Sequence, residues 1–279
     1  MAAAIALDKG LTAPAAGQAT ETAKAIANSL LGGERKAILL GNAAAHHVNA
    51  SSLLALANWI GAQTGATVGY LTEAANTVGA QLAGALPGAN GLHAGQMLDG
   101  KLKAVILLNN EPEFDSAPGA KARASLNAAQ MVVTLSPFKA NLDFSDVLLP
   151  MAPFTETSGT FVSAEGRVQG FHAVVKPLGE TRPAWKILRV LANLLGLPGF
   201  DFESSQDVLQ QVPGLADGLV PAELLGNASN AADITLLSAG DVVGAVPAVA
   251  SIYQLDSLVR RATSLQLTAD ARAFKKVAA

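Results

Sequence analysis

The chain has 279 residues and a formal net charge of −3, and half of its residues are hydrophobic while 15% are charged. That length suffices for one large domain or two small ones. The slightly acidic balance argues against a nucleic-acid binder, and the absence of cysteine excludes disulfides, cysteine zinc sites and thiolate-held iron–sulfur clusters from this chain. No apolar run reaches the roughly 18 residues of a membrane span and no secretory signal is evident, so we expect neither.

The low charge content has two explanations. A typical soluble domain has about 25% charged residues. The deficit fits a surface that is partly buried against other subunits, and it fits equally well an alanine-rich composition without such meaning.

Helical and strand-like segments alternate in the first part of the chain. After a loose entry over residues 1–19, an alanine-rich segment predicts a helix over Thr20–Leu31, which Gly32 and Gly33 end. The next predicted elements are a strand over 36–41, a helix over 48–63, a strand over 66–71, a weaker helix over 72–83, and a glycine-rich loop with one helical turn over 84–100.

A second series of strands follows over 103–108, 130–135 and 147–149, with a helix over 117–127. Strands that alternate with helices imply βαβ units and right-handed crossovers. We therefore predict an α/β fold. Its core is a mostly parallel, doubly wound sheet with helices on both faces, followed by a β-hairpin, a helix and an irregular C-terminal region.

The segment from Ser145 to Phe171 organises these predictions. The apolar run Val147–Leu149 predicts a strand covered on both faces, which Pro150 ends. The β-forming runs 160–163 and 167–175 then predict a hairpin, in which Gly166 takes the positive φ of the turn.

Three charged residues surround this hairpin. We expect Glu156 or Glu165 to pair with Arg167 and hold the hairpin, because charges near a buried strand need partners. The alternative is an acid/base pair of the two glutamates, but the sequence supplies no nearby nucleophile or oxyanion hole.

Beyond the hairpin, a helix is predicted over 183–195, because Pro183 suits the first turn and Gly196 suits the end. Its apolar face comprises Trp185, Leu188, Leu191 and Leu195. Residues 207–212 predict a helical turn, residues 223–232 a loop, and the last forty residues a peripheral arm. We place domain boundaries at 1–178 for the α/β domain and 179–279 for the C-terminal extension.

Two loops follow strands of the predicted sheet, where open α/β sheets bind ligands. They are residues 41–47, which contain His46 and His47, and residues 109–115, which contain Glu111, Glu113 and Asp115. Neither has a phosphate-cradling glycine motif, and the acidic residues would repel phosphate. A ligand site therefore competes with a relict cleft filled by side chains or neighbouring subunits.

The histidines and basic clusters are weaker candidates. Adjacent His46 and His47 do not share a face and lack a third ligand, so a loop pair is favoured over a metal site. His93 and His172 stand alone and indicate surface or hydrogen-bonded core positions. Arg260–Arg261 and Lys275–Lys276 predict solvated faces of the tail or, alternatively, a subunit contact.

Three motifs carry a family resemblance. They are D-V-x-L-P at Asp146–Pro150, E-x-x-G-T at Glu156–Thr160 and E-G-R-x-Q at Glu165–Gln169. Together with the TRPAWKILRVLANLLG segment they resemble the molybdopterin oxidoreductase superfamily. With LVRRATSLQLTADA near the C-terminus, the chain is more narrowly similar to the C-terminal part of the large iron–sulfur (G) subunit of bacterial NADH:quinone oxidoreductase, complex I.

The resemblance implies a role within an electron-transfer complex. In molybdenum enzymes of the family, loops equivalent to 41–47 and 109–115 embrace the pterin nucleotide, whereas the complex I subunit lacks the molybdenum cofactor. Its iron–sulfur clusters lie in N-terminal cysteine-rich domains that are absent here. We therefore expect no catalytic, cofactor or metal residues in this chain, and a structural motif that comprises Glu156, Gly159, Thr160, Glu165, Gly166 and Arg167.

The expected role is a structural, cofactor-free part of NADH:quinone oxidoreductase. Its implied partners are other peripheral-arm subunits on the cytoplasmic side of the bacterial inner membrane. One alternative is a fragment of an active molybdopterin-dependent oxidoreductase, and another is a free-standing α/β protein that binds a small ligand.

Overall fold

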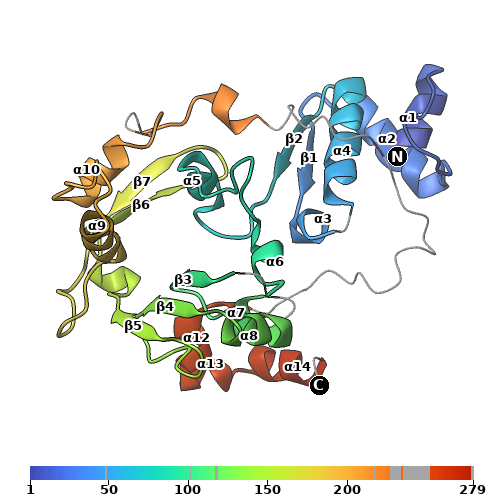
Figure 1. Ribbon diagram of the computed structural model, residues 1–279. Helices are drawn as coiled ribbons and strands as arrows, with labels where there is room; N and C mark the ends of the chain where they lie inside the picture. The colour runs from blue at the N-terminus through green and yellow to red at the C-terminus, as the bar shows by residue number, and fades with distance from the viewer. Residues whose placement is uncertain are drawn as a thin grey trace. The chain divides into compact units, whose positions relative to one another are not determined.

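The computed structural model describes residues 1–47, 49–100, 102–116, 119–215, 218–226, 234 and 252–277 (Figure 1). The chain divides into two compact units. Unit 1 takes in residues 1–79, 162–167 and 219–249, and unit 2 takes in residues 80–161, 168–218 and 250–279. The boundary that the sequence suggests after residue 178 stays a prediction.

Unit 1 is built around a two-stranded parallel sheet. Strands β1 (Ala37–Leu40) and β2 (Thr67–Tyr70) pair along their whole length. The helical elements of this unit are α1 (Ala2–Lys9), α2 (Glu21–Gly32), α3 (Asn42–Ala45), α4 (Ala50–Thr64), the start of α5 (Thr77–Leu82) and the 3₁₀ turn η2 (Ala222–Leu225). The predicted start of α2 is confirmed, because the Thr20 hydroxyl accepts a hydrogen bond from the Ala23 amide at 3.2 Å.

The first residues form a helix where the sequence predicted a loose entry. Helix α1 ends at Gly10, which has a left-handed φ of 65°. Ile5 is completely buried in a cluster with Ala27 of α2 and Ile60 of α4. An alanine-rich segment has high helix propensity, and burial of Ile5 against two later helices stabilises it, which the local pattern did not reveal.

Unit 2 contains a three-stranded parallel sheet in the order β3 (Ala104–Leu108), β4 (Met131–Ser136) and β5 (Val147–Pro150). The predicted α/β class with parallel strands is confirmed. The five parallel strands belong to two sheets, one in each unit. The central strand β4 is the best buried, with Thr134 and Leu135 completely inaccessible.

Strand β5 differs from its prediction. It was expected to be covered on both faces, but Val147 is 40% exposed. The reason is its position at the edge of the sheet, where it has β4 as its ladder partner on one side only. A short apolar run does not distinguish a central strand from an edge strand.

The helices of unit 2 are short. They are α6 (Ala94–Met97), α7 (Pro112–Asp115), α8 (Gly119–Asn127), α9 (Ala184–Leu194), α10 (Ser205–Gln210), α11 (Ile252–Leu255), α12 (Ser257–Arg261), α13 (Thr263–Gln266) and α14 (Ala269–Val277), with the 3₁₀ turn η1 (Phe154–Glu156). The predicted α9 is confirmed, but Leu195 lies beyond its end and is 66% exposed, so it does not extend the apolar face. Among the residues described in both units, no helix is long and apolar enough to cross a membrane.

The predicted hairpin is confirmed as β6 (Gly159–Val162) and β7 (Val168–Phe171). Gly166 has a φ of +83°, and its amide donates to the Ser163 carbonyl at 2.9 Å across the turn. A Cβ at Gly166 would lie 2.5 Å from Cδ1 of Leu225, so glycine is required for space as well as for conformation.

Two further predictions concern the C-terminal third. Residues 222–225 form η2 where a loop over 223–232 was predicted, and residues 227–232 lie outside the described residues. The last forty residues were expected to be a peripheral arm, but their described part forms α11 to α14, and α11 and α12 contact the rest of unit 2. The side chains of Lys275 and Lys276 lie outside the described structure.

Candidate functional site

The loop that follows β3 forms a compact acidic turn at the carboxyl end of the sheet. Pro112 occupies the first turn of α7, which suits its fixed φ. The Asp115 carboxylate accepts a hydrogen bond from the Glu111 amide at 2.7 Å, and the Glu111 carbonyl accepts the amides of Phe114 and Asp115. The amides of Glu111, Phe114 and Asp115 are therefore already engaged within this short turn.

Two arginines from α12, about 150 residues further along the chain, close this turn. Arg261 donates from Nη1 to Glu111 Oε1 at 2.7 Å and from Nη2 to Glu111 Oε2 at 3.0 Å, which is a bidentate pair. Arg260 donates to Asp115 Oδ1 at 2.8 Å and lies 3.3 Å from Glu111 Oε1. We call Glu111, Asp115, Arg260 and Arg261 the strand-end cluster; its members belong to α12 or to the turn at α7 (Figure 1).

The strand-end cluster is largely withdrawn from solvent. Glu111 is 7% exposed, and the side chain of Arg260 is 12% exposed. Both guanidinium groups also lie on aromatic rings, Arg260 at 5.1 Å from the centre of Phe114 and Arg261 at 4.3 Å from the centre of Phe138. These cation–π contacts add to the attachment of both arginines.

The charges of the strand-end cluster set the protonation of Glu111. Burial by itself raises the pKa of a carboxyl group, but the hydrogen bonds and charges of Arg261 and Arg260 outweigh burial and hold the pKa of Glu111 below its ordinary value. Glu111 is therefore ionised at neutral pH, and the two carboxylates balance the two guanidinium groups.

A second, more exposed layer of ion pairs surrounds the turn. Arg123 of α8 bridges Glu113, at 3.0 Å, and Asp143. The Asn141 side chain donates to the Asn110 carbonyl at 2.9 Å, with Asn141 itself in a left-handed conformation. The side chain of Arg123 is 40% exposed and that of Asp143 is 68% exposed. Ion pairs that water reaches contribute little, so this layer adds less to stability than the strand-end cluster.

The loop after β1 has a different character. His46 forms a 2.8 Å contact with Glu73, and His47 accepts a hydrogen bond from the Asn49 amide at 3.0 Å. In the part of the chain that the structure describes, no group of three or more histidines or acidic residues could hold a metal ion. The preference for a loop pair over a metal site at His46 and His47 stays a prediction.

The isolated histidines differ in their environment. His93 caps the start of α6 by accepting the Gln96 amide, which confirms its surface role. His172 borders two hollows of unit 2, next to Phe171 in one and to Lys176 in the other.

Two of the predicted motif residues make hydrogen bonds to the backbone of other residues. Glu156 Oε2 accepts the Leu178 amide at 2.9 Å, and the Arg167 carbonyl accepts the Ser163 amide at 3.0 Å. Within unit 1, no ion pair joins Arg167 to Glu165 among the described residues. The predicted alternative, a pair of Arg167 with Glu156, stays a prediction. The backbone ladder already holds the hairpin, which leaves the Arg167 side chain without that task.

The other motif residues serve packing. A Cβ at Gly159 would lie 2.7 Å from the Phe171 ring, so glycine there allows β7 to approach β6 closely. Thr160 lies in β6, and Gly166 shapes the turn.

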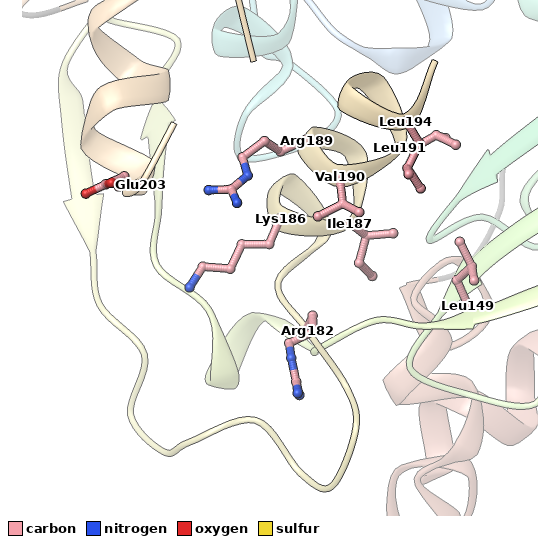
Figure 2. A pocket seen from close by; sticks show the side chains of 9 residues that line it. All are labelled: Leu149, Arg182, Lys186, Ile187, Arg189, Val190, Leu191, Leu194 and Glu203. Carbon is pink, nitrogen blue, oxygen red and sulfur yellow. The ribbon is translucent and has the colours of Figure 1, made fainter. Parts of the chain in front are cut away.

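Figure 2 shows a second candidate region, a hollow of about 670 Å³ beside α9. Ile187, Leu191 and Leu194 lie on the same side of α9 as Leu149 of β5, whereas Lys186 and Arg189 extend to the other side, where Glu203 also lies. We call this hollow the α9 groove. The sequence analysis did not identify it, although the basic residues at 182, 186 and 189 have helical spacing and could have indicated it.

The strand-end cluster was identified only in part from the sequence. The acidic turn was singled out as a candidate loop, but Arg260 and Arg261 were assigned to a solvated tail or a subunit contact, and the structure shows them paired within the chain. The sequence signal for this pairing was the opposite charge of two adjacent arginines and a loop with three acidic residues.

Comparison with known proteins gives a family match. The sequence profile described as molybdopterin oxidoreductase matches residues 12–194. "Putative formate dehydrogenase SAB2186c" of Staphylococcus aureus (strain bovine RF122 / ET3-1) is 31% identical over 118 residues, which are 42% of this chain and 12% of that protein. "Probable oxidoreductase YjgC" of Bacillus subtilis (strain 168) is 39% identical over 74 residues, which are 26% of this chain and 7% of that protein.

The alignments thus cover a small part of these long relatives. They agree with the wider superfamily that the three motifs indicated. The narrower similarity to complex I finds no support in the names of these relatives.

Proposed function

Because this chain belongs to the molybdopterin oxidoreductase family, we propose that it is a structural, cofactor-free part of an oxidoreductase assembly. In this proposal it supports electron transfer from NADH to quinone without holding a redox centre. Its partners are peripheral-arm subunits of NADH:quinone oxidoreductase on the cytoplasmic side of the bacterial inner membrane.

The observation that carries the proposal is the strand-end cluster. The family resemblance assigns the loop after β3 to the pterin nucleotide, whose phosphates need cations or free amide donors. Here Nη1 and Nη2 of Arg261 are both hydrogen-bonded to Glu111. The amides of Glu111, Phe114 and Asp115 are hydrogen-bonded within the turn. The residues of this loop therefore do not fit the group.

The loop after β1 also does not fit the pterin nucleotide. Its helix α3 has only four residues, and its polar side chains His46 and His47 already have partners in Glu73 and Asn49. No cysteine is available for a metal–sulfur bond. A chain with these loops suits a supporting role better than a catalytic one.

The alternative is a part of an active molybdopterin-dependent oxidoreductase. Two relatives support it through their names, one a formate dehydrogenase and the other an oxidoreductase. In that case a ligand to the metal would come from polypeptide outside the aligned region, and the present chain would bind the cofactor only as part of a larger enzyme.

Two measurements separate these possibilities. The tagged chain is isolated from its host membranes in mild detergent, and the eluate is assayed for NADH–ferricyanide activity, molybdenum, and pterin fluorescence after acid release. Activity with flavin and iron–sulfur partners and without molybdenum is expected. Stoichiometric molybdenum and pterin in the eluate would overturn the cofactor-free role and favour the alternative.

A further inference from the structure

The exposed side of α9 has two adjacent stripes of opposite character. Ile187, Val190, Leu191 and Leu194 recur at helical spacing and line the α9 groove. Lys186 and Arg189 of α9 lie beside them, together with Arg182, which precedes the helix. The surface is thus amphipathic along the length of the helix.

The cations of the α9 groove have no acidic partner among the described residues. Arg189 donates to the Phe202 carbonyl, Arg182 donates to the Thr181 carbonyl at 2.8 Å, and Lys186 lies 5.2 Å from the centre of the Trp185 ring. Glu203 is the one carboxylate that lines the groove. Three positive charges against one negative charge leave the groove basic, although the whole chain carries −3.

The α9 groove is open to solvent. Leu194 is 81% exposed and Val190 is 48% exposed, and exposed leucines continue past the helix at Leu195 and Leu197. Pockets for small ligands enclose 70–90% of the ligand surface, which so open a face does not do. A contiguous exposed apolar surface with a charged border is typical of a protein contact.

We propose that the α9 groove is the docking site for a helical segment of another polypeptide whose apolar stripe is flanked by carboxylates. Leucine-like anchors at i, i+3, i+4 and i+7 would enter between α9 and Leu149, which is the geometry of helix-in-groove recognition. Glutamates or aspartates beside that stripe would pair with Lys186 and Arg182. This inference rests on α9 and its surroundings alone, so it stands whether or not the assembly contains molybdenum.

The hollow favours such a helix over a lipid surface. A bilayer contacts convex, apolar surfaces, whereas the apolar side chains here line a hollow between a helix and a strand. A convex ridge with acidic edges matches both the shape and the charge of the groove.

The test uses the full chain and a synthetic helical peptide of about 18 residues, long enough to be helical in water. Its leucines have i, i+3, i+4, i+7 spacing, with glutamates on both sides of that stripe. Control peptides carry lysines in place of the glutamates, or the same residues in scrambled order. Binding is measured by fluorescence anisotropy at low and high salt, and we expect the glutamate peptide alone to bind, more weakly at high salt.

Variants of the chain assign the binding to the groove. Lys186→Glu is expected to weaken binding on the order of tenfold, since it replaces an attraction by a repulsion. Leu194→Ser tests the apolar stripe. The matched controls are Lys139→Glu, an exposed lysine outside the groove, and Leu178→Ser, a leucine that is 78% exposed elsewhere; both should bind as wild type.

Several outcomes would overturn the proposal. They are equal binding by the lysine peptide, no binding by any peptide, or equal affinity of Lys186→Glu and wild type. Dimerisation in sedimentation velocity that Leu194→Ser abolishes would assign the groove to a second copy of the chain. Lys186-dependent binding to vesicles of anionic and neutral lipids, without peptide binding, would assign it to a membrane.

Discussion

Arg261 donates hydrogen bonds from Nη1 and Nη2 to the two carboxylate oxygens of Glu111, at 2.7 Å and 3.0 Å, across 150 residues of sequence. The pair fastens α12 to the turn after β3 in unit 2. Four predictions follow from this cluster and from the contacts of the hairpin.

Replacement of Arg260 by alanine is expected to destabilise the protein. It removes the partner of Asp115 and one of two cations at Glu111 in a largely buried site, so we expect a loss of about 2–3 kcal/mol of unfolding free energy, below the 3–5 kcal/mol of a fully unpaired buried charge because Arg261 remains. Urea unfolding measures it. The control is Arg123→Ala, whose ion pairs are exposed, and a loss as large as that of Arg260→Ala would contradict the role of burial.

Acidification is expected to weaken the protein through Glu111. Because the pKa of Glu111 is lower in the folded state than in the unfolded chain, its contribution to stability is present above the unfolded pKa and is lost as the pH falls through the folded pKa. The urea concentration at the unfolding midpoint of the wild-type protein should therefore be lower at pH 3 than at pH 7.

The matched variant is Glu111→Gln. It should be less stable than wild type at pH 7, and its midpoint should change less between the two pH values, because the titrating group is gone. An identical pH dependence of variant and wild type would contradict the assignment of this pH-dependent stability to Glu111.

Gly166→Val is expected to be among the most damaging substitutions in the hairpin. A side chain at φ +83° costs about 1–2 kcal/mol, and overpacking against Leu225 at 2.5 Å adds about 1–3 kcal/mol. Gly179→Val separates the two effects, because Gly179 has φ +57° and open space around its Cβ. Thermal denaturation should show a larger loss for Gly166→Val, and equal losses would exclude the steric contribution.

Asn76 is expected to anchor the end of β6. Its Oδ1 accepts the amide of Val162 at 2.8 Å, and Val162 is 1% exposed, so Asn76→Leu leaves a buried donor without its acceptor. That should cost about 1–3 kcal/mol. Asn76→Asp keeps the acceptor and should retain most of the stability, and amide exchange at Val162 should quicken only in the leucine variant.

The local elements could be predicted from the sequence because short-range rules govern them. Thr20 caps α2, Gly166 turns the hairpin, and the strands at 104–108 and 131–136 follow from apolar runs bounded by polar residues. The family motifs between Asp146 and Gln169 are likewise visible in the sequence alone. These features depend on neighbours in the chain, so composition and order determine them.

Only the tertiary structure decided the partners of residues that are far apart in the chain. The helix at Ala2–Lys9 depends on the burial of Ile5 between later helices, and the exposure of Val147 depends on the position of β5 at a sheet edge. Arg260 and Arg261 have the sequence pattern of a solvated pair, and they form ion pairs within the chain, with Arg260 largely buried, because the fold placed Glu111 and Asp115 opposite them. Periodicity along the chain has no information about such pairings, since charge compensation and burial arise from contacts that the fold alone creates.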